Sequence, residues 1–400
     1  MYLNSGKAFK QGGYLKLIVA LLCLSLSCSL AQADIYYSAK VFGPVVNIHA
    51  IDEQGQLRKV TNNKRWRDVE HDVANNGLIS FASNRIPQGL KDGARAQENY
   101  HVFVKNLKTD ELVQVSQRYE HARQPKFSPL SDKLAFIAFE GQQQSLIIYD
   151  IASKATTRLQ SAKFIYDFSW SPDNQHIAFS SQNKTSSRLD IIDINKLTRK
   201  NIISSLIKQS TKASSASKNT VQSGEKHSLT SGKVEQLAQF FVAPTWSPNG
   251  NYIAYISHPL MKNVKRSLKV YQLASQKTRL ISADSMQVQA PITWSNNSDT
   301  LLYSALINYQ QYYDEHSHKK VYLGGMHIFS SDLLGNSQQL TQGDHLFKQP
   351  VFSPDEKHIA YFYADKLNAR TLQLNTMLSD GSKQKLLQQG IAKNAMLQWQ

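Results

Sequence analysis

The stretch Ser171-Pro172-Asp173-Asn174-Gln175-His176-Ile177-Ala178-Phe179 decides the fold, because copies of it recur along the 400-residue chain. Serine, proline, an acid or amide and then asparagine or glycine suit a type I turn, since proline presets φ and the last residue accepts a left-handed exit. The apolar residues that follow are typical of a half-buried strand. Each copy therefore predicts a strand, a tight turn and a second strand. The other copies begin at Val73, Ser128, Ser247, Ser295 and Ser353.

A second pattern follows each copy and completes a larger unit. Residues 146–159, for example, contain an apolar strand, a polar turn and another strand. Two successive hairpins make a four-stranded antiparallel blade, and blades repeated radially make a β-propeller. We therefore predict an all-β chain that forms a single propeller of four-stranded blades. Turn chemistry explains Asp173 and Asp355, so their carboxylates carry no predicted catalytic role.

The number of strands predicts how the propeller closes. Residues 35–41, 46–51 and 56–61 have the character of three strands without an inner partner. Residues 394–399 align with the inner strand expected at 289–294 and can supply that partner. We expect seven blades, the closing one shared by the two ends of the chain, because this closure hides exposed strand edges. Six blades is the alternative, if the N-terminal segment packs elsewhere.

The first 33 residues have the features of a secretory signal peptide. Three lysines precede an apolar core at residues 17–30, and Ala31-Gln32-Ala33 offers small residues for cleavage before Asp34. The apolar run is too short to favour a membrane-spanning helix. We expect a cleaved leader over residues 1–33, a propeller over residues 34–400 without a transmembrane segment, and a periplasmic location.

Cysteine content and charge narrow the classes of site and partner. Cys23 and Cys28 both fall in the expected leader, so no disulfide or thiolate chemistry is predicted for the mature domain. Neither cysteine follows a lipoprotein pattern, which favours an ordinary signal peptide over a lipid anchor. Loss of the leader lowers the net charge from +16 to +13. A basic chain favours acidic envelope proteins, anionic glycans or a membrane surface as partners. Nucleic acid is not expected, because the chain shows no binding motif for it.

Four longer segments are expected to emerge on one face. Residues 84–98, 257–266 and 308–320 connect the second and third strands of their blades, and residues 204–239 connect two blades. Connections of these two kinds lie on the same side of a propeller, and loops commonly carry function. Residues 204–239 are rich in serine, lysine and threonine and are predicted to be disordered. Their lysines could engage an anionic surface, or the segment is an inert insertion.

The three shorter segments supply the candidate binding residues. Arginine binds carboxylates and phosphates bidentately, and tyrosine offers a rigid amphipathic surface. For each residue the alternative is a solvated position without a ligand. The candidates are Arg85, Lys91, Arg95, His258, Lys262, Arg266, Tyr309, Tyr312, Tyr313, Asp314, Glu315, His316 and His318.

The candidates at residues 314–318 include two histidines and two carboxylates, which are possible ligands of a divalent metal. These residues are adjacent on an expected loop and lack motif spacing, so a solvated loop is favoured and no metal or other cofactor is predicted. His176 and His358 occupy equivalent places in two copies of the repeat. That equivalence favours a structural role over catalysis.

Residues 49–83 and the copies around Trp170, Trp246 and Phe352 resemble the TolB-like propeller repeats. The resemblance spans essentially all of residues 34–400 and implies a WD-like propeller. TolB proteins carry an additional α/β domain, and propeller peptidases carry a hydrolase domain. The chain contains no Gly-x-Ser-x-Gly nucleophile elbow. Oligogalacturonate lyases hold a metal through histidines, and no residue-by-residue match to that site is present.

The resemblance leaves two functional expectations. The first is a non-catalytic periplasmic module that binds envelope proteins, as the TolB-like likeness implies. The alternative is a carbohydrate-active enzyme, a lyase or hydrolase, or a glycan-binding propeller that uses the same loop face. Fold alone does not separate them, because propellers host unrelated functions.

Overall fold

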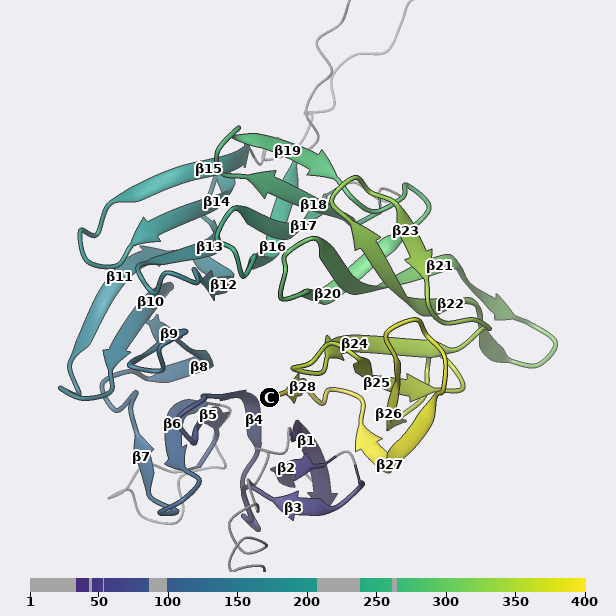
Figure 1. Cartoon of the computed structure of the whole chain (residues 1–400), viewed down its shortest axis with the longest axis horizontal. Helices are drawn as coiled ribbons and strands as arrows, with labels where there is room; N and C mark the ends of the chain where they lie inside the picture. Colours follow the sequence, from purple (N-terminus) through teal and green to yellow (C-terminus); the bar gives the residue numbers. More distant parts are fainter. Residues whose placement is uncertain (1–33, 43–44, 53, 86–98, 207–237, 261–264) are drawn as a thin grey trace, which may run out of the picture. The chain divides into compact units, whose positions relative to one another are not determined.

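The computed structural model describes residues 34–42, 45–52, 54–85, 99–206, 238–260 and 265–400. The expected leader at residues 1–33 lies outside them. Asp34–Gln400 is one compact unit, and its sheets follow one another around a centre with their first strands innermost (Figure 1). No helix within the described ranges is long and apolar enough to span a membrane.

Consecutive strands of the described residues pair antiparallel, as a propeller requires. Five sheets contain four strands each, and four of these five follow one another along the chain. They are β4 (Asp68–Val73), β5 (Leu78–Ser83), β6 (His101–Asn106), β7 (Leu112–Gln114); β8 (His121–Phe127), β9 (Lys133–Glu140), β10 (Gln143–Asp150), β11 (Thr156–Ala162); β12 (Phe164–Trp170), β13 (His176–Gln182), β14 (Ser186–Asp193), β15 (Arg199–Leu206); and β16 (Gln239–Trp246), β17 (Tyr252–Pro259), β18 (Ser267–Gln272), β19 (Lys277–Leu280).

An eight-stranded sheet follows, in which two groups of four strands are joined through one parallel pair, Met326 with Leu346. Its strands are β20 (Gln287–Trp294), β21 (Thr300–Asp314), β22 (Lys319–Asp332), β23 (Ser337–Gln339), β24 (Leu346–Phe352), β25 (His358–Ala364), β26 (Thr371–Leu378) and β27 (Lys385–Ala392). The all-β propeller expected from the repeats is confirmed. The count of seven blades stays a prediction.

Both ends of the described chain meet in one further sheet. It has the order β28 (Leu397–Trp399), β1 (Ile35–Phe42), β2 (Val45–Ile51), β3 (Leu57–Lys59). Ile35 pairs with Trp399, and the backbones of Asp34 and Gln400 exchange two hydrogen bonds of 2.8 and 3.1 Å. The expected pairing of the C-terminal strand with the three N-terminal strands is therefore present.

The serine that opens five of the six repeats accepts a hydrogen bond from the amide five residues later. The Ser247 hydroxyl is fully buried and accepts a hydrogen bond of 2.9 Å from the Tyr252 amide, which opens the next strand. The Gly250 amide donates to the Ser247 carbonyl over 3.0 Å and closes the turn. Gly250 has a φ of 76° and Asn174 a φ of 61°, so the left-handed exit expected at this position is observed. The side chain of the turn serine thus fixes the start of the following strand.

The core lies between neighbouring sheets. In one cluster Ile137 and Leu146 of the β8–β11 sheet pack with Phe168 and Ile177 of the next sheet. Polar contacts also join the innermost strands: the Phe127 amide donates to Asp72 over 2.7 Å, and Lys126 forms an ion pair of 2.8 Å with Asp167. The inner strands are therefore held to one another by hydrogen bonds as well as by apolar packing.

Three of the expected loops are partly strand in the structure. Residues 257–259 of the expected loop 257–266 belong to β17. Residues 308–320, expected to be a loop, extend β21 and β22 into a long hairpin that runs outward beyond the other strands of its sheet (Figure 1). Tyrosine and valine pair across it, as in Tyr312 with Val321, and such residues favour strands. Residues 204–206, assigned to the disordered segment, belong to β15. Residues 207–237 lie outside the described residues.

Candidate functional site

The face expected to bind a partner is the one where the innermost strands begin. The connection between β5 and β6, the connection between β17 and β18 and the β21–β22 hairpin share this side by strand alternation. Lys91, Arg95 and Lys262 lie outside the described residues. The other candidates can be placed one by one.

Arg85 forms an internal ion pair. Its guanidinium contacts both carboxylate oxygens of Asp68 at 2.7 and 2.9 Å, and Asp68 is fully buried. The same guanidinium lies 5.3 Å from the ring of Phe81 and 5.0 Å from that of Phe103. Its Nε also donates to the Ser83 hydroxyl over 2.9 Å, so this stacked arginine, which neutralises a buried acid, is a structural element.

His258 and Arg266 lie close to each other, His258 near the end of β17 and Arg266 just before β18. His258 belongs to β17, and its ring lies 6.4 Å from that of Phe240. Burial, and secondarily the Arg266 charge, lowers the pKa of His258, so the imidazole is neutral at pH 7. Burial also lowers the pKa of Arg266, whose buried Nε donates to no acceptor among the described residues.

The remaining candidates lie on the long hairpin. Tyr309, Tyr312 and Tyr313 are 40%, 51% and 56% exposed. Asp314 accepts hydrogen bonds from the Ser317 hydroxyl (2.7 Å) and the His316 amide (3.1 Å), which lower its pKa and shape the turn that holds Glu315 and His318. In the described part of the chain, no three His, Cys, Asp or Glu side chains are grouped so that they could hold a metal ion.

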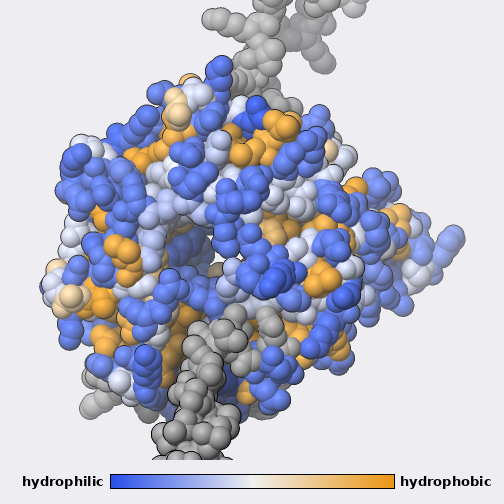
Figure 2. Space-filling view, viewed as in Figure 1, coloured by the Kyte–Doolittle hydropathy of each residue, from blue (hydrophilic) through white to orange (hydrophobic). Residues whose placement is uncertain are grey.

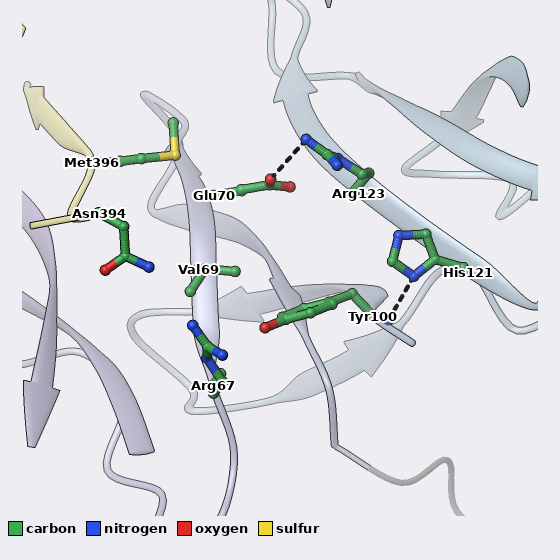
Figure 3. Close-up of a pocket in the computed structure, with 8 residues that line it drawn as sticks. All are labelled: Arg67, Val69, Glu70, Tyr100, His121, Arg123, Asn394 and Met396. Carbon is green, nitrogen blue, oxygen red and sulfur yellow. Dashed lines mark hydrogen bonds and ion pairs between the residues drawn. The ribbon is translucent and has the colours of Figure 1, made fainter. Parts of the chain in front are cut away.

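A pocket lies on the expected face, at the beginning of β4, β8 and β28. We call it the inner pocket; its volume is about 450 Å³, and its walls come from the β4–β7 sheet, the β8–β11 sheet and the residues that lead into β28 near the C-terminus (Figure 3). Figure 2 shows that the surface is hollowed near its centre, around which the innermost strands lie. The lining residues are Arg67, Val69, Glu70, Tyr100, His121, Arg123, Asn394 and Met396.

Glu70 links two sheets across the inner pocket. Its carboxylate accepts a hydrogen bond of 2.8 Å from the Gln124 amide and lies 3.4 Å from the Arg123 guanidinium. Glu70 and Gln124 have φ values of 52° and 53°, at bulges in β4 and β8. Ala243 and Gln349 have the same conformation at the bulges of other inner strands. The strained backbone is therefore a repeat feature rather than a signature of this pocket.

His121 is committed to a structural hydrogen bond. Its Nδ1 accepts the Tyr100 amide over 2.8 Å, and its ring packs edge-on against Phe139 at 4.4 Å (Figure 3). Burial, followed by the charges of Arg123 and His101, lowers the pKa of His121 to about 4. The imidazole is therefore neutral at pH 7 with its proton on Nε2, and its Nδ1 lone pair is occupied.

Arg67 is the least compensated cation of the inner pocket. Its backbone amide donates to Asn84 over 2.7 Å, which fixes the residue just before β4. Its buried Nε has no hydrogen-bond partner within the described ranges. A buried donor without an acceptor costs about 1–3 kcal/mol, so an anionic group that reached it would be favoured.

Two lysines extend this positive charge along neighbouring inner strands. Lys348 lies just before the bulge of β24, in the place that Arg123 occupies in β8. The Lys348 amine donates to the Lys393 carbonyl, and burial, then the charge of Lys393, lowers the pKa of Lys348 to about 8. Together Arg67, Arg123, Lys348 and Lys393 form what we call the basic arc, at the beginnings of four consecutive inner strands.

Sequence reasoning missed the inner pocket because its residues are far apart in the chain. The available signal was the alignment of the inner strands: Arg123 and Lys348 both precede a Gln-Pro pair, Gln124-Pro125 and Gln349-Pro350. That alignment places two cations at equivalent positions around the centre. The candidate residues were taken from the irregular loops, whereas the inner pocket is lined mainly by residues at the beginnings of strands.

Comparisons with known proteins show the fold. No protein-family model matches the chain. A puromycin-hydrolyzing peptidase of Mycobacterium tuberculosis is similar with a TM-score of 0.59 and 8% identity; the match covers 91% of this chain and 53% of the peptidase. An oligogalacturonate lyase solved with manganese gives a TM-score of 0.51 and 12% identity, covering 87% of this chain and 84% of the lyase.

TolB from Acinetobacter baumannii matches with a TM-score of 0.47 and 15% identity, over 91% of this chain and 82% of that chain. At these identities the likenesses concern the fold alone. A similar fold is thus found in a peptidase and a lyase, and the choice among functions has to come from the site.

Proposed function

We propose that the protein is a non-catalytic binding module of the bacterial cell envelope, which docks an anionic envelope protein at the inner pocket. The observation that carries this proposal is the basic arc, where Arg67 presents a buried donor without a partner in the described residues. Arginine side chains at the end of a hollow attract and orient carboxylates. The periplasmic location belongs to the same proposal and is supported by the leader-like sequence of residues 1–33.

The chemistry of the inner pocket favours binding over catalysis. A general base needs a free lone pair and a pKa near the working pH, whereas His121 has its Nδ1 occupied and a pKa of about 4. Glu70, the pocket's acid, is held by the Gln124 amide and Arg123. These groups are arranged to fix the pocket wall, and Arg67 remains available to a ligand.

Crosslinked capture from a periplasmic extract, compared between matched variants, tests the proposal. The full chain and Arg158→Gln, which removes a cation from the outer strand β11, should capture the same envelope protein. Arg67→Gln combined with Arg123→Gln should reduce that capture at least tenfold. Equal capture by all three proteins would overturn the inner pocket as the docking site.

The carbohydrate alternative has its own assay. The purified chain is incubated with an anionic oligosaccharide, with and without added manganese, and the products are separated. We expect the oligosaccharide to remain intact. Cleavage that disappears in the double variant would replace the binding module with an enzyme at the same pocket.

A further inference from the structure

A contact between two aromatic rings of neighbouring sheets occurs more than once on the face opposite the inner pocket. The inner strands end on this face. The first residue of a second strand packs against the aromatic residue that ends the next inner strand. The ring centroids are 6.3 Å apart for His176 and Trp246 and 6.5 Å apart for His358 and Trp399, at interplanar angles of 34° and 36°. Each histidine–tryptophan pair lines a pocket, which we call the His176 pocket and the His358 pocket.

The polar groups of the His176 pocket find partners inside the protein. His176 Nδ1 lies 3.0 Å from an Asp173 oxygen, and its Nε2 lies 4.0 Å from Asp193. The Trp246 indole N–H donates to the Gly250 carbonyl over 3.2 Å. Arg199 and Lys200 also line this pocket, so two acids balance two cations.

The His358 pocket has lost these acids. Strand register places Leu378 opposite His358, where Asp193 stands opposite His176. The Asp355 carboxylate contacts the Lys357 amine at 3.1 Å, where Asp173 contacts His176. The Ser353 hydroxyl, the Lys357 amide (3.1 Å) and the Lys357 amine lower the pKa of Asp355 to about 2. The second carboxylate is therefore committed elsewhere.

The polar side chains that line the His358 pocket carry mostly hydrogen-bond donors. Its lining residues are His358, Thr376, Leu378, Lys383, Lys385 and Trp399, and its volume is about 230 Å³. Trp399 is 9% exposed; its buried indole N–H and the buried Nδ1 of His358 have no partner among the described residues. Trp170, Trp246 and Trp294, which end other inner strands, each donate to a backbone carbonyl at 3.0–3.2 Å.

We propose that the His358 pocket binds a small oxyanion, a phosphate or carboxylate group, which supplies the acceptors that Asp173, Asp193 and Gly250 supply in the His176 pocket. Buried polar groups without partners in a native structure call for an explanation such as a bound ion. Lysine ammonium groups and an indole N–H bind oxyanions, and the tryptophan face accommodates an apolar body next to the charge. This site lies on the face opposite the inner pocket and does not depend on the proposed docking function.

The five tryptophans give a direct probe of the site. The full chain is labelled with ¹⁵N-tryptophan, the indole resonance of Trp399 is assigned with Trp399→Phe, and sodium phosphate is titrated against sodium chloride at matched ionic strength. A saturable shift of the Trp399 indole is expected, with the Trp246 indole as an internal control. A parallel titration with citrate distinguishes a phosphate site from a general oxyanion site.

Three variants sharpen the result. Leu378→Asp restores the carboxylate of the His176 pocket and should abolish the shift. Lys383→Gln, at an exposed turn position, should weaken the apparent affinity about tenfold, and it keeps the test valid if the aspartate variant fails to fold. Lys200→Gln removes a cation from the His176 pocket and should leave the titration unchanged. A Trp399 indole that stays still in both anions, or that moves equally in Leu378→Asp, would overturn the proposal.

Discussion

Removal of residues 397–400 tests the closing sheet most directly, because it deletes β28 and leaves the edge of β1 open. The loss of Trp399, which is 9% exposed, alone costs about 3–5 kcal/mol. The Gln398 side chain also bonds the Val73 amide and carbonyl at 3.0 and 3.3 Å, each contact contributing about 1 kcal/mol. The free energy of unfolding should therefore fall by about 5–7 kcal/mol.

The assay is thermal unfolding followed by circular dichroism. With an unfolding entropy of about 2 cal/mol/K per residue, such a loss lowers the Tm by about 6–9 °C. Leu386→Ala, at a residue of β27 that is 43% exposed, is the control and should change stability by no more than about 0.5 kcal/mol. A truncated chain that melts within about 1 °C of the full chain would refute a stabilising role for the shared sheet.

Three further predictions concern single residues. Ser247→Ala should destabilise the chain by about 1–3 kcal/mol in urea unfolding, because the amide after the turn loses its buried acceptor. Arg85→Ala should cost about 3–5 kcal/mol by leaving Asp68 charged and buried, and adding Asp68→Asn should recover part of that loss. Burial lowers the pKa of His71 to about 4, so its contribution to stability is present above pH ~6.5 and is lost as the pH falls toward 4. His71→Leu should reduce the difference in unfolding free energy between pH 7 and pH 4.5. Burial raises the pKa of Asp72 to about 6, so Asp72 contributes to that difference with the opposite sign, equally in the original chain and in the variant. An unchanged difference would contradict the role given to His71.

The fold could be predicted because its decisive interactions are local. The Ser247 hydroxyl bonds an amide five residues later, and the left-handed residue lies inside the same turn. The hairpin segment 308–320 was wrongly expected to be a loop because its polar and charged residues were given more weight than the strand preference of its tyrosines, which pair with residues of the opposite strand such as Val321. Asn308, with a φ of 51°, and Gly324, with a φ of 78°, form a bulge at its base, and a Cβ on Gly324 would lie 2.4 Å from the Ile307 carbonyl oxygen. The requirement for glycine at position 324 follows from the pairing of the two strands.

The site was harder to predict for a geometric reason. A propeller brings together the beginnings of all its inner strands, so Arg67 and Asn394 line one pocket although most of the chain separates them. The charge of a loop residue says little by itself: Arg85 was selected for its exposed loop position, and its guanidinium is used to neutralise Asp68. Ion pairs and hydrogen bonds decide which cations remain available to a ligand. Such contacts between sheets form only in the folded propeller.

A comparison of residues at equivalent positions of the sheets therefore distinguishes structural residues from functional ones better than residue type does. The same backbone conformation occurs at Glu70, Gln124 and Gln349, so that conformation supports the ring and carries no specificity. Side chains that differ between equivalent positions of the sheets are not required for this shared backbone conformation. In the His358 pocket the Trp399 indole N–H and His358 Nδ1 have no partner among the described residues, whereas their counterparts Trp246 and His176 are partnered by Gly250 and Asp173. A substitution that costs stability in one sheet, while its counterpart remains satisfied, is the pattern expected where a ligand completes the site.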